Sequence, residues 1–201
     1  KGVEETVPYE LVSIPGGELV TATADYDGFS QPSAEVYGKV HNSTAGSMTG
    51  IAVAAANTDV WVKCGGDDKT NGFWYTLDRG ETWNQAKKSP LSTGPAYGGS
   101  VAVSADGSTF YWAPSNGGYV FWSDDQGKSW NQAEGAMNAQ RIIADQVNPE
   151  YVYAASGSSF YYSSDRGKTF TANKELSVFT TTRPVAVPGV EGKIYYPAMG
   201  L

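Results

Sequence analysis

An eight-residue motif that occurs three times constrains the fold of this chain more than any other feature. The motif has the form Ser/Thr-x-Asp-x-Gly-x-Ser/Thr-Trp/Phe and occupies residues 76–83, 123–130 and 163–170. Its aspartates, Asp78, Asp125 and Asp165, follow one another at intervals of 47 and 40 residues. A period of about 40–50 residues is typical of the blades of a β-propeller. The sequence therefore predicts a repeated β-sheet unit.

The residue types of the motif indicate a turn that holds the fold together. An aspartate at this place can accept hydrogen bonds from turn amides. The glycine permits a positive φ, which a hairpin needs. The final Trp or Phe begins the next strand and packs against the sheet. We therefore interpret Asp78, Asp125 and Asp165 as structural residues, although their repetition could also suggest paired catalytic acids.

The segments around each motif read as four-stranded antiparallel meanders. Residues 100–133 form one such unit, residues 140–172 repeat it, and residues 49–86 are an earlier copy. Short strands at 9–13 and 18–23 belong to a preceding blade, and strands at 183–187 and 193–196 begin another. Residues 1–201 are thus predicted to be an all-β partial propeller of about four blades that begins and ends inside blades.

Composition and charge exclude several classes of protein. Charged residues make up 17% of the chain and 24 residues are glycine, which argues against a coiled coil. The formal net charge of −7 makes nucleic acid an unexpected partner, because binding phosphates needs clustered basic residues. No apolar run is long enough for a membrane helix. Cys64 and His41 are the only residues of their types, so we expect no metal site and no disulfide.

A segment without the motif is the candidate for chemistry. Asp25 and Asp27 flank Tyr26 and precede a loop of about twenty residues, and long loops in compact domains are often functional. If the strand continued, both carboxylates would share one face and disfavour simultaneous ionisation. The alternative is a polar strand end. His41 follows in the same loop and is either a structural donor or part of the cleft.

Tryptophans are the other candidates for contact with a ligand. Four of them are possible sugar platforms: Trp61, Trp74, Trp112 and Trp122. We expect most of the four to pack between blades instead, with one or two at most exposed to a sugar.

The repeated motif resembles the Asp-box (BNR repeat) of sialidases, xyloglucanases and sortilin-type propellers. Three further segments, at residues 4–29, 145–149 and 188–192, resemble glycoside hydrolase family 74, the xyloglucanases. The first of them is similar to the start of the second propeller in that family, where a Gly-Asp-x-x-Gly-Phe sequence follows a strand. The resemblance extends over nearly the whole chain and implies part of a seven-bladed Asp-box propeller.

The resemblance also implies a function and a site. Family members cleave the β-1,4-glucan backbone of xyloglucan with inversion, in a cleft between two propellers that each supply one aspartate. The matching residue is Asp25, with general acid as the preferred role, and Tyr26, Asp27, Phe29 and His41 are the expected substrate-binding residues. No cofactor is implied. The expected partners are a plant cell-wall polysaccharide, xyloglucan or a related β-glucan, and an N-terminal propeller; the expected location is extracellular, after secretion.

Four positions depart from the family pattern. Ala24 replaces a usual Gly, Asp27 stands where Gly is common, and Ser30-Gln31 replace a frequent Arg-His pair. These changes could alter a sugar subsite or the environment of Asp25. A non-catalytic propeller that binds carbohydrate or peptide is therefore the alternative, and the 201 residues alone are expected to be inactive because the opposite wall of the cleft is absent from them.

Overall fold

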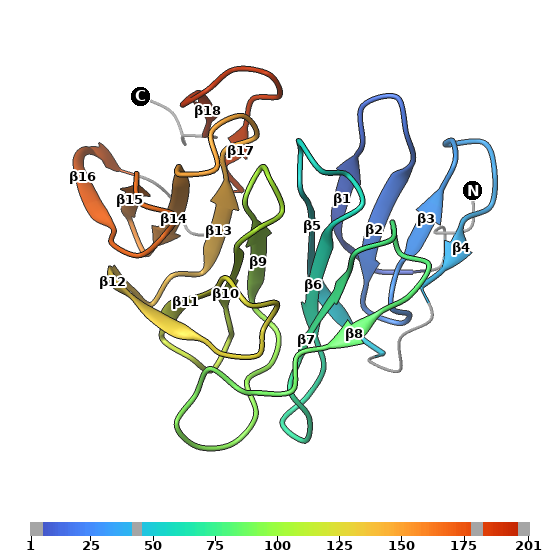
Figure 1. Cartoon of the computed structure of the whole chain (residues 1–201), viewed down its shortest axis with the longest axis horizontal. Coiled ribbons are helices and arrows are strands. Elements are labelled where there is room, and N and C mark those ends of the chain that lie inside the picture. Colours follow the sequence, from blue (N-terminus) through green and yellow to red (C-terminus); the bar gives the residue numbers. More distant parts are fainter. Residues whose placement is uncertain (1–5, 42–45, 178–182, 197–201) are drawn as a thin grey trace.

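The computed structural model describes residues 6–41, 46–177 and 183–196, and the regular elements in these residues are all β-strands (Figure 1). The strands form four four-stranded sheets and one two-stranded sheet, and every pair is antiparallel. Within each sheet the strands pair in the order in which they follow along the chain. This is the blade of a β-propeller. The prediction of an all-β propeller with four-stranded antiparallel blades is confirmed.

The blades are numbered in chain order. Blade one contains β1 (Pro8–Ser13), β2 (Leu19–Thr23), β3 (Phe29–Gln31) and β4 (Lys39–Val40). Blade two contains β5 (Met48–Val53), β6 (Trp61–Gly65), β7 (Phe73–Thr76) and β8 (Asn84–Gln85). Blade three contains β9 (Ser100–Val103), β10 (Phe110–Ala113), β11 (Tyr119–Ser123) and β12 (Asn131–Met137). Blade four contains β13 (Arg141–Ala144), β14 (Val152–Ser156), β15 (Ser159–Ser163) and β16 (Thr171–Ser177). The two-stranded sheet pairs β17 (Val185–Ala186) with β18 (Ile194–Tyr195).

Blade one differs from its sequence prediction. Two of its strands were expected at residues 9–13 and 18–23, followed by a long loop. The structure adds β3 and β4 inside that loop, so the described part of the chain contains a complete first blade. These strands have three and two residues, which is too short for a visible pattern of alternating polarity. The described residues include no helix of a length and apolarity that would span a bilayer.

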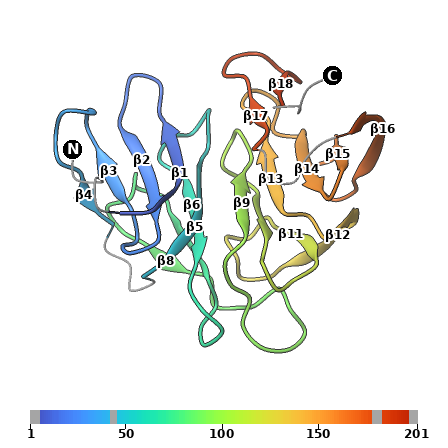
Figure 2. The same ribbon diagram turned by 180° about the vertical axis from the view of Figure 1, so that it is seen from behind.

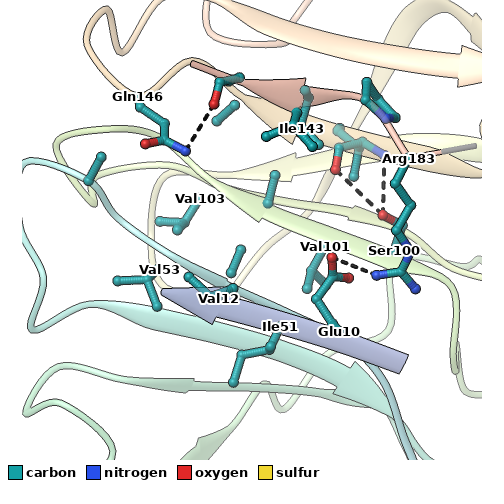
Figure 3. Close-up of a pocket in the computed structure, with 18 of the residues that line it drawn as sticks. Glu10, Val12, Ile51, Val53, Ser100, Val101, Val103, Ile143, Gln146 and Arg183 are labelled. Atoms are coloured by element: carbon teal, nitrogen blue, oxygen red, sulfur yellow. Dashed lines mark hydrogen bonds and ion pairs between the residues drawn. The ribbon is translucent and has the colours of Figure 1, made fainter. Parts of the chain in front are cut away.

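The blades fan out from their first strands, which lie side by side (Figures 1 and 2). A cavity of about 320 Å³ lies among β1, β5, β9, β13 and β17 (Figure 3). An ion pair between Glu10 and Arg183, with 2.6 Å between Oε1 and Nη1, connects β1 to the segment before β17. The Ser100 hydroxyl accepts a hydrogen bond from the Ile142 amide and so ties β9 to β13. The first strands therefore form the inner wall of the propeller.

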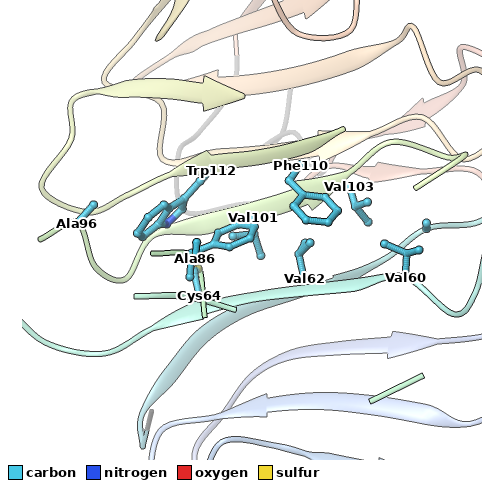
Figure 4. Close-up of a cluster of buried hydrophobic side chains, with 11 residues drawn as sticks. Val60, Val62, Cys64, Ala86, Ala96, Val101, Val103, Phe110 and Trp112 are labelled. Atoms are coloured by element: carbon cyan, nitrogen blue, oxygen red, sulfur yellow. The ribbon is translucent and has the colours of Figure 1, made fainter. Parts of the chain in front are cut away.

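Apolar side chains between neighbouring blades form the core. In blade two, Val62 and Cys64 on β6 pack against Val101 and Trp112 of blade three (Figure 4). The alternate residue Trp61 packs against blade one. This follows from the period of two in a strand, because both faces of a blade are covered by neighbours. Cys64 is a free, buried cysteine, and burial raises the pKa of its thiol to about 12.

The three copies of the motif form turns of one geometry, which we call the motif turns (residues 76–83, 123–130 and 163–170). In the first, Asp78 accepts hydrogen bonds from the Thr76 hydroxyl (2.6 Å), the Thr82 amide (2.9 Å) and the Thr82 hydroxyl (2.6 Å). Gly80 has φ +82°, and a Cβ there would lie 2.8 Å from the Trp61 ring. Asp125 and Asp165 bind the matching hydroxyls and amides of their own turns. The prediction that these aspartates sit in hairpin turns and bind backbone is confirmed.

The up-and-down order of the strands separates the loops into two groups. The motif turns connect the third and fourth strands of blades two, three and four, and they share one end of the sheets with the connections between first and second strands. The connections between second and third strands lie at the opposite end. Residues 24–28 connect β2 to β3, so the candidate catalytic segment lies at the end away from the three motif turns.

Candidate functional site

The loop at residues 24–28 is held by backbone and hydroxyl contacts at its middle and at its ends. The Thr23 hydroxyl donates to the Tyr26 carbonyl at 2.7 Å, and the Phe29 amide donates to the Thr21 hydroxyl at 3.0 Å. The Gly28 carbonyl accepts from the His41 amide at 2.9 Å. Gly28 has φ +135°, and a Cβ there would lie 1.9 Å from the Thr21 carbonyl oxygen. A glycine is therefore required at the end of this loop.

Asp25 and Asp27 have opposite environments. The Asp25 side chain is exposed and makes no hydrogen bond or ion pair within the part of the chain that the structure describes. Asp27 is buried, at 4% relative exposure. The strand ends at Thr23 and the chain bends through the next residues, so the condition under which both carboxylates would share a strand face is not met. Asp25 alone presents its carboxylate to the surface.

Asp27 forms an ion pair with a lysine of the neighbouring blade. The Lys63 ammonium on β6 lies 3.8 Å from Asp27 Oδ2, and both side chains are almost completely buried. The same ammonium lies 3.9 Å from the centre of the Trp83 ring. Burial lowers the pKa of Lys63 to about 8, although the charge of Asp27 opposes this change. We call Asp27, Lys63, Trp83 and His41 the buried polar cluster.

His41 lies in this cluster as a neutral imidazole. Its Nε2 is 2.9 Å from the Ser30 hydroxyl, and its ring centre is 5.2 Å from that of Trp83. Burial lowers the pKa of His41 to about 3, and the positive charges of Lys63 and Lys39 contribute. A histidine with this pKa does not exchange a proton near neutral pH, so the geometry gives it a packing role beneath the loop.

The two aromatic residues of the segment differ in exposure. Tyr26 is 53% exposed and lies beside Asp25, whereas Phe29 is buried at 8%. Their ring centres are 6.1 Å apart. Tyr26 is thus placed to meet a ligand at the surface of the loop. Substrate contact by Tyr26, Asp27, Phe29 and His41 stays a prediction, and the structure places the last three beneath the surface.

The tryptophans pack mainly between blades. Trp61, Trp74 and Trp112 are buried, and Trp122 is partly buried against the core between blades three and four. The three buried rings offer no free face to a sugar. Within the described residues, no three His, Cys, Asp or Glu side chains come together as a metal site would require.

Lys63 is the residue of this region that sequence reasoning missed. It lies in an apolar run of β6, between Val62 and Cys64. A lysine in a strand that is apolar on both faces is unusual, because its charge must be paired when buried. Two residues together could have indicated the ion pair from the sequence: Lys63 in an apolar strand, and Asp27 at a position where the family commonly has glycine.

Comparison with known proteins identifies the family. The model of the DUF6242 beta propeller domain matches residues 37–188 of this chain. The chain belongs to the DUF6242 beta propeller domain family. A xyloglucanase from Paenibacillus sp is 33% identical to this DUF6242 domain chain over 209 residues, which cover 98% of it and 20% of the relative.

Solved structures similar to this DUF6242 domain chain support the same relationship. The GH74 xyloglucanase from Xanthomonas campestris superposes with a TM-score of 0.84 at 26% identity, over 96% of this chain and 29% of that enzyme. The GH74 enzyme of Niastella koreensis superposes with a TM-score of 0.78 at 34% identity, over 96% of this chain and 28% of that one. The resemblance to glycoside hydrolase family 74 is confirmed. The chain spans less than a third of the length of each of these relatives.

Proposed function

We propose that this chain is part of a secreted glycoside hydrolase that cleaves the β-1,4-glucan backbone of xyloglucan, and that Asp25 is one of its two catalytic carboxylates. The observation that carries the proposal is the environment of Asp25. It is exposed on a loop that hydrogen bonds fix at Tyr26 and at Phe29, in the blade that lacks the motif. Similarity to xyloglucanases over 98% of the chain supports the choice of substrate.

An inverting glycosidase needs two carboxyl groups about 6.5–9.5 Å apart, one to protonate the leaving oxygen and one to activate water. Asp25 is proposed as one of these groups, with the general-acid role preferred. An exposed carboxylate without a hydrogen-bond donor among the described residues has both oxygens free to contact a substrate. The three aspartates of the motif turns do not have this freedom, because hydroxyl and amide groups of their own turns occupy their oxygens.

The second carboxylate is proposed to come from another propeller across the cleft. Asp27 is the nearest acid in sequence, but it is buried against Lys63 and cannot face the opposite side of a bound sugar chain. Inversion needs the two groups on opposite faces of the sugar. We therefore propose that a seven-bladed N-terminal Asp-box propeller forms the opposite wall of the cleft. We also propose that the 201 residues alone release no reducing ends from xyloglucan.

The test is the Asp25→Asn variant of the full-length protein, with release of reducing ends from xyloglucan as the measurement. Hydrolysis is expected to fall by two orders of magnitude or more, while binding of the polysaccharide is retained, because the amide cannot transfer a proton. Asp124→Asn is the matched control, since Asp124 is an exposed aspartate in a motif turn at the other end of the sheets. Turnover close to wild type in Asp25→Asn would remove Asp25 from the mechanism.

The same assay separates the enzyme from a binding propeller. If the wild-type full-length protein, with its N-terminal propeller, binds xyloglucan but releases no reducing ends, the hydrolase proposal is contradicted. The non-catalytic carbohydrate-binding function would then be the better description.

A further inference from the structure

Lys63 is the only lysine or arginine among the described residues with a buried side chain. It is the third residue of β6, the second strand of blade two. Trp112 and Ala154 are the third residues of the corresponding strands in blades three and four. Both are uncharged, and both pack toward the preceding blade. Among blades two, three and four as the structure describes them, the charge at this position occurs in the one whose preceding blade carries the Asp25 loop.

The contacts of Lys63 connect it to that loop. Its ammonium reaches Asp27, two residues after Asp25, at 3.8 Å. The Trp83 ring covers it at 3.9 Å. In the next interface the equivalent pair is uncharged, with the Trp112 and Trp130 rings 5.8 Å apart. An ion pair in a buried site is screened little by solvent, so blade two holds the middle of the loop by charge.

We infer that Lys63 is a positioning residue for Asp25: its ion pair with Asp27 fixes the loop so that the Asp25 carboxylate meets the substrate in one orientation. This inference rests on the proposed function. The Tyr26 and Gly28 carbonyls are held within blade one, by the Thr23 hydroxyl and the His41 amide, whereas the ion pair connects the Asp27 side chain to blade two. Loss of the ion pair allows the loop to shift against blade two, and a displacement of about 1 Å at a reacting group can cost about 100-fold in rate.

Among the described residues, the titratable and charged groups near the loop come from the loop itself, from β6, from β4 and from the residue that follows β4. Asp27 belongs to the loop and Lys63 to β6, His41 follows β4, and Lys39 on β4 adds positive charge near His41. Removal of Asp27 and Lys63 together removes one negative and one positive charge. The net charge of the protein is therefore unchanged in this double variant. A shift in its pH profile of hydrolysis then reports a change in the surroundings of Asp25.

The experiment uses the double variant Asp27→Asn/Lys63→Met of the full-length protein, which leaves no buried charge unpaired. We expect kcat for xyloglucan to fall at least tenfold, KM to change less than threefold, and the acidic limb of the pH profile to move. Lys63→Arg, which keeps a cation beside Asp27, is expected to retain at least a third of kcat.

The matched control is Glu18→Gln/Arg79→Met. This pair also connects blades one and two, with 3.2 Å between Arg79 Nη2 and Glu18 Oε1, but on the side of the motif turns. It weakens the same interface without touching the Asp25 loop, so kcat and the pH profile should match wild type. A loss in the control equal to that of the double variant would show that Lys63 acts only through the stability of the interface, and would overturn the inference.

Two further outcomes have distinct meanings. Wild-type kcat and pH profile in Asp27→Asn/Lys63→Met would overturn the positioning role while Asp25→Asn still abolishes hydrolysis. If Asp25→Asn itself keeps full activity, the proposed function fails first. The two failures are therefore distinguishable in one set of assays.

Discussion

The loop at residues 24–28 and the three motif turns each carry an aspartate between two strands, but they use it differently. In a motif turn, both carboxylate oxygens accept hydrogen bonds from the turn itself, as Asp78 does from Thr76 and Thr82. These bonds lower the pKa of Asp78 to about 2. Asp25 has no such donors among the described residues. In the motif turns, the carboxylate oxygens accept hydrogen bonds that stabilise the turn. The Asp25 carboxylate accepts no such bonds from the described residues, so its oxygens are free to contact a substrate.

The largest expected change in stability comes from the ion pair beneath the loop. Lys63→Met removes the cation beside the buried Asp27 carboxylate, and breaking a buried pair costs about 3–5 kcal/mol. Chemical denaturation of the protein measures the free energy of unfolding. Lys39→Met is the control, since its ion pair with Glu81 is exposed and is worth about 0–1 kcal/mol. Equal losses in the two variants would show that the loop is not held by buried charge.

His41 sharpens the comparison through pH. Its pKa is about 3 in the folded protein and about 6.5 in the unfolded chain. Between these values only the unfolded chain takes up the proton, so stability falls as the pH falls below 6.5. We expect the wild type to lose about 2 kcal/mol more than His41→Gln between pH 7 and pH 5. Parallel losses in urea unfolding at the two pH values would contradict this.

The motif turns are expected to give a smaller effect on stability and none on chemistry. Asp125→Ala removes the acceptor for Ser123 and Ser129 and should cost about 1–2 kcal/mol, by analogy with the loss of a helix cap. Hydrolysis by the full-length protein should not change at temperatures where the variant is folded. Thermal unfolding and reducing-end release on the same samples check both parts, and a hundredfold loss of hydrolysis would break the comparison.

The smallest expected change in stability comes from the arginine that precedes the glycine in two of the motif turns, Arg79 in the first and Arg166 in the third. Arg166 reaches Asp106 of blade three at 3.1 Å and Glu150 at 2.7 Å, and Arg79 reaches Glu18 of blade one, whereas the second turn has Gln126 in this place. Arg166→Gln should cost about 0.5–1 kcal/mol because these pairs are partly exposed. A double-mutant cycle with Asp106→Asn at low and high salt measures the coupling, which should shrink as salt rises.

Much of the fold could be predicted from the sequence because each motif turn is local. The hydrogen bonds of Asp78 join residues no more than four positions apart, so spacing alone indicates the turn. The short strands β3 and β4 could not be predicted, since two or three residues carry no periodic signal. Their pairing depends on β2 and on contact with blade two.

For the candidate site, too, some residues could be predicted from the sequence and others could not. The segment without the motif drew attention to Asp25 and Asp27 together, and only the resemblance to a family chose Asp25 between them, because an exposed aspartate has no local signature. The burial of Asp27 could not be foreseen from Asp25-Tyr26-Asp27 itself. It depends on Lys63, which lies in another blade and meets the loop only after the blades pack.

The most direct test of the central claim measures stability and hydrolysis together for Asp25→Ala in the full-length protein. The account predicts that the free energy of unfolding stays within about 0.5 kcal/mol of wild type, as is usual for an exposed residue, while hydrolysis of xyloglucan falls by at least two orders of magnitude. A loss of stability like that of Asp125→Ala, with hydrolysis preserved, would show that Asp25 is one more structural aspartate and would contradict the account.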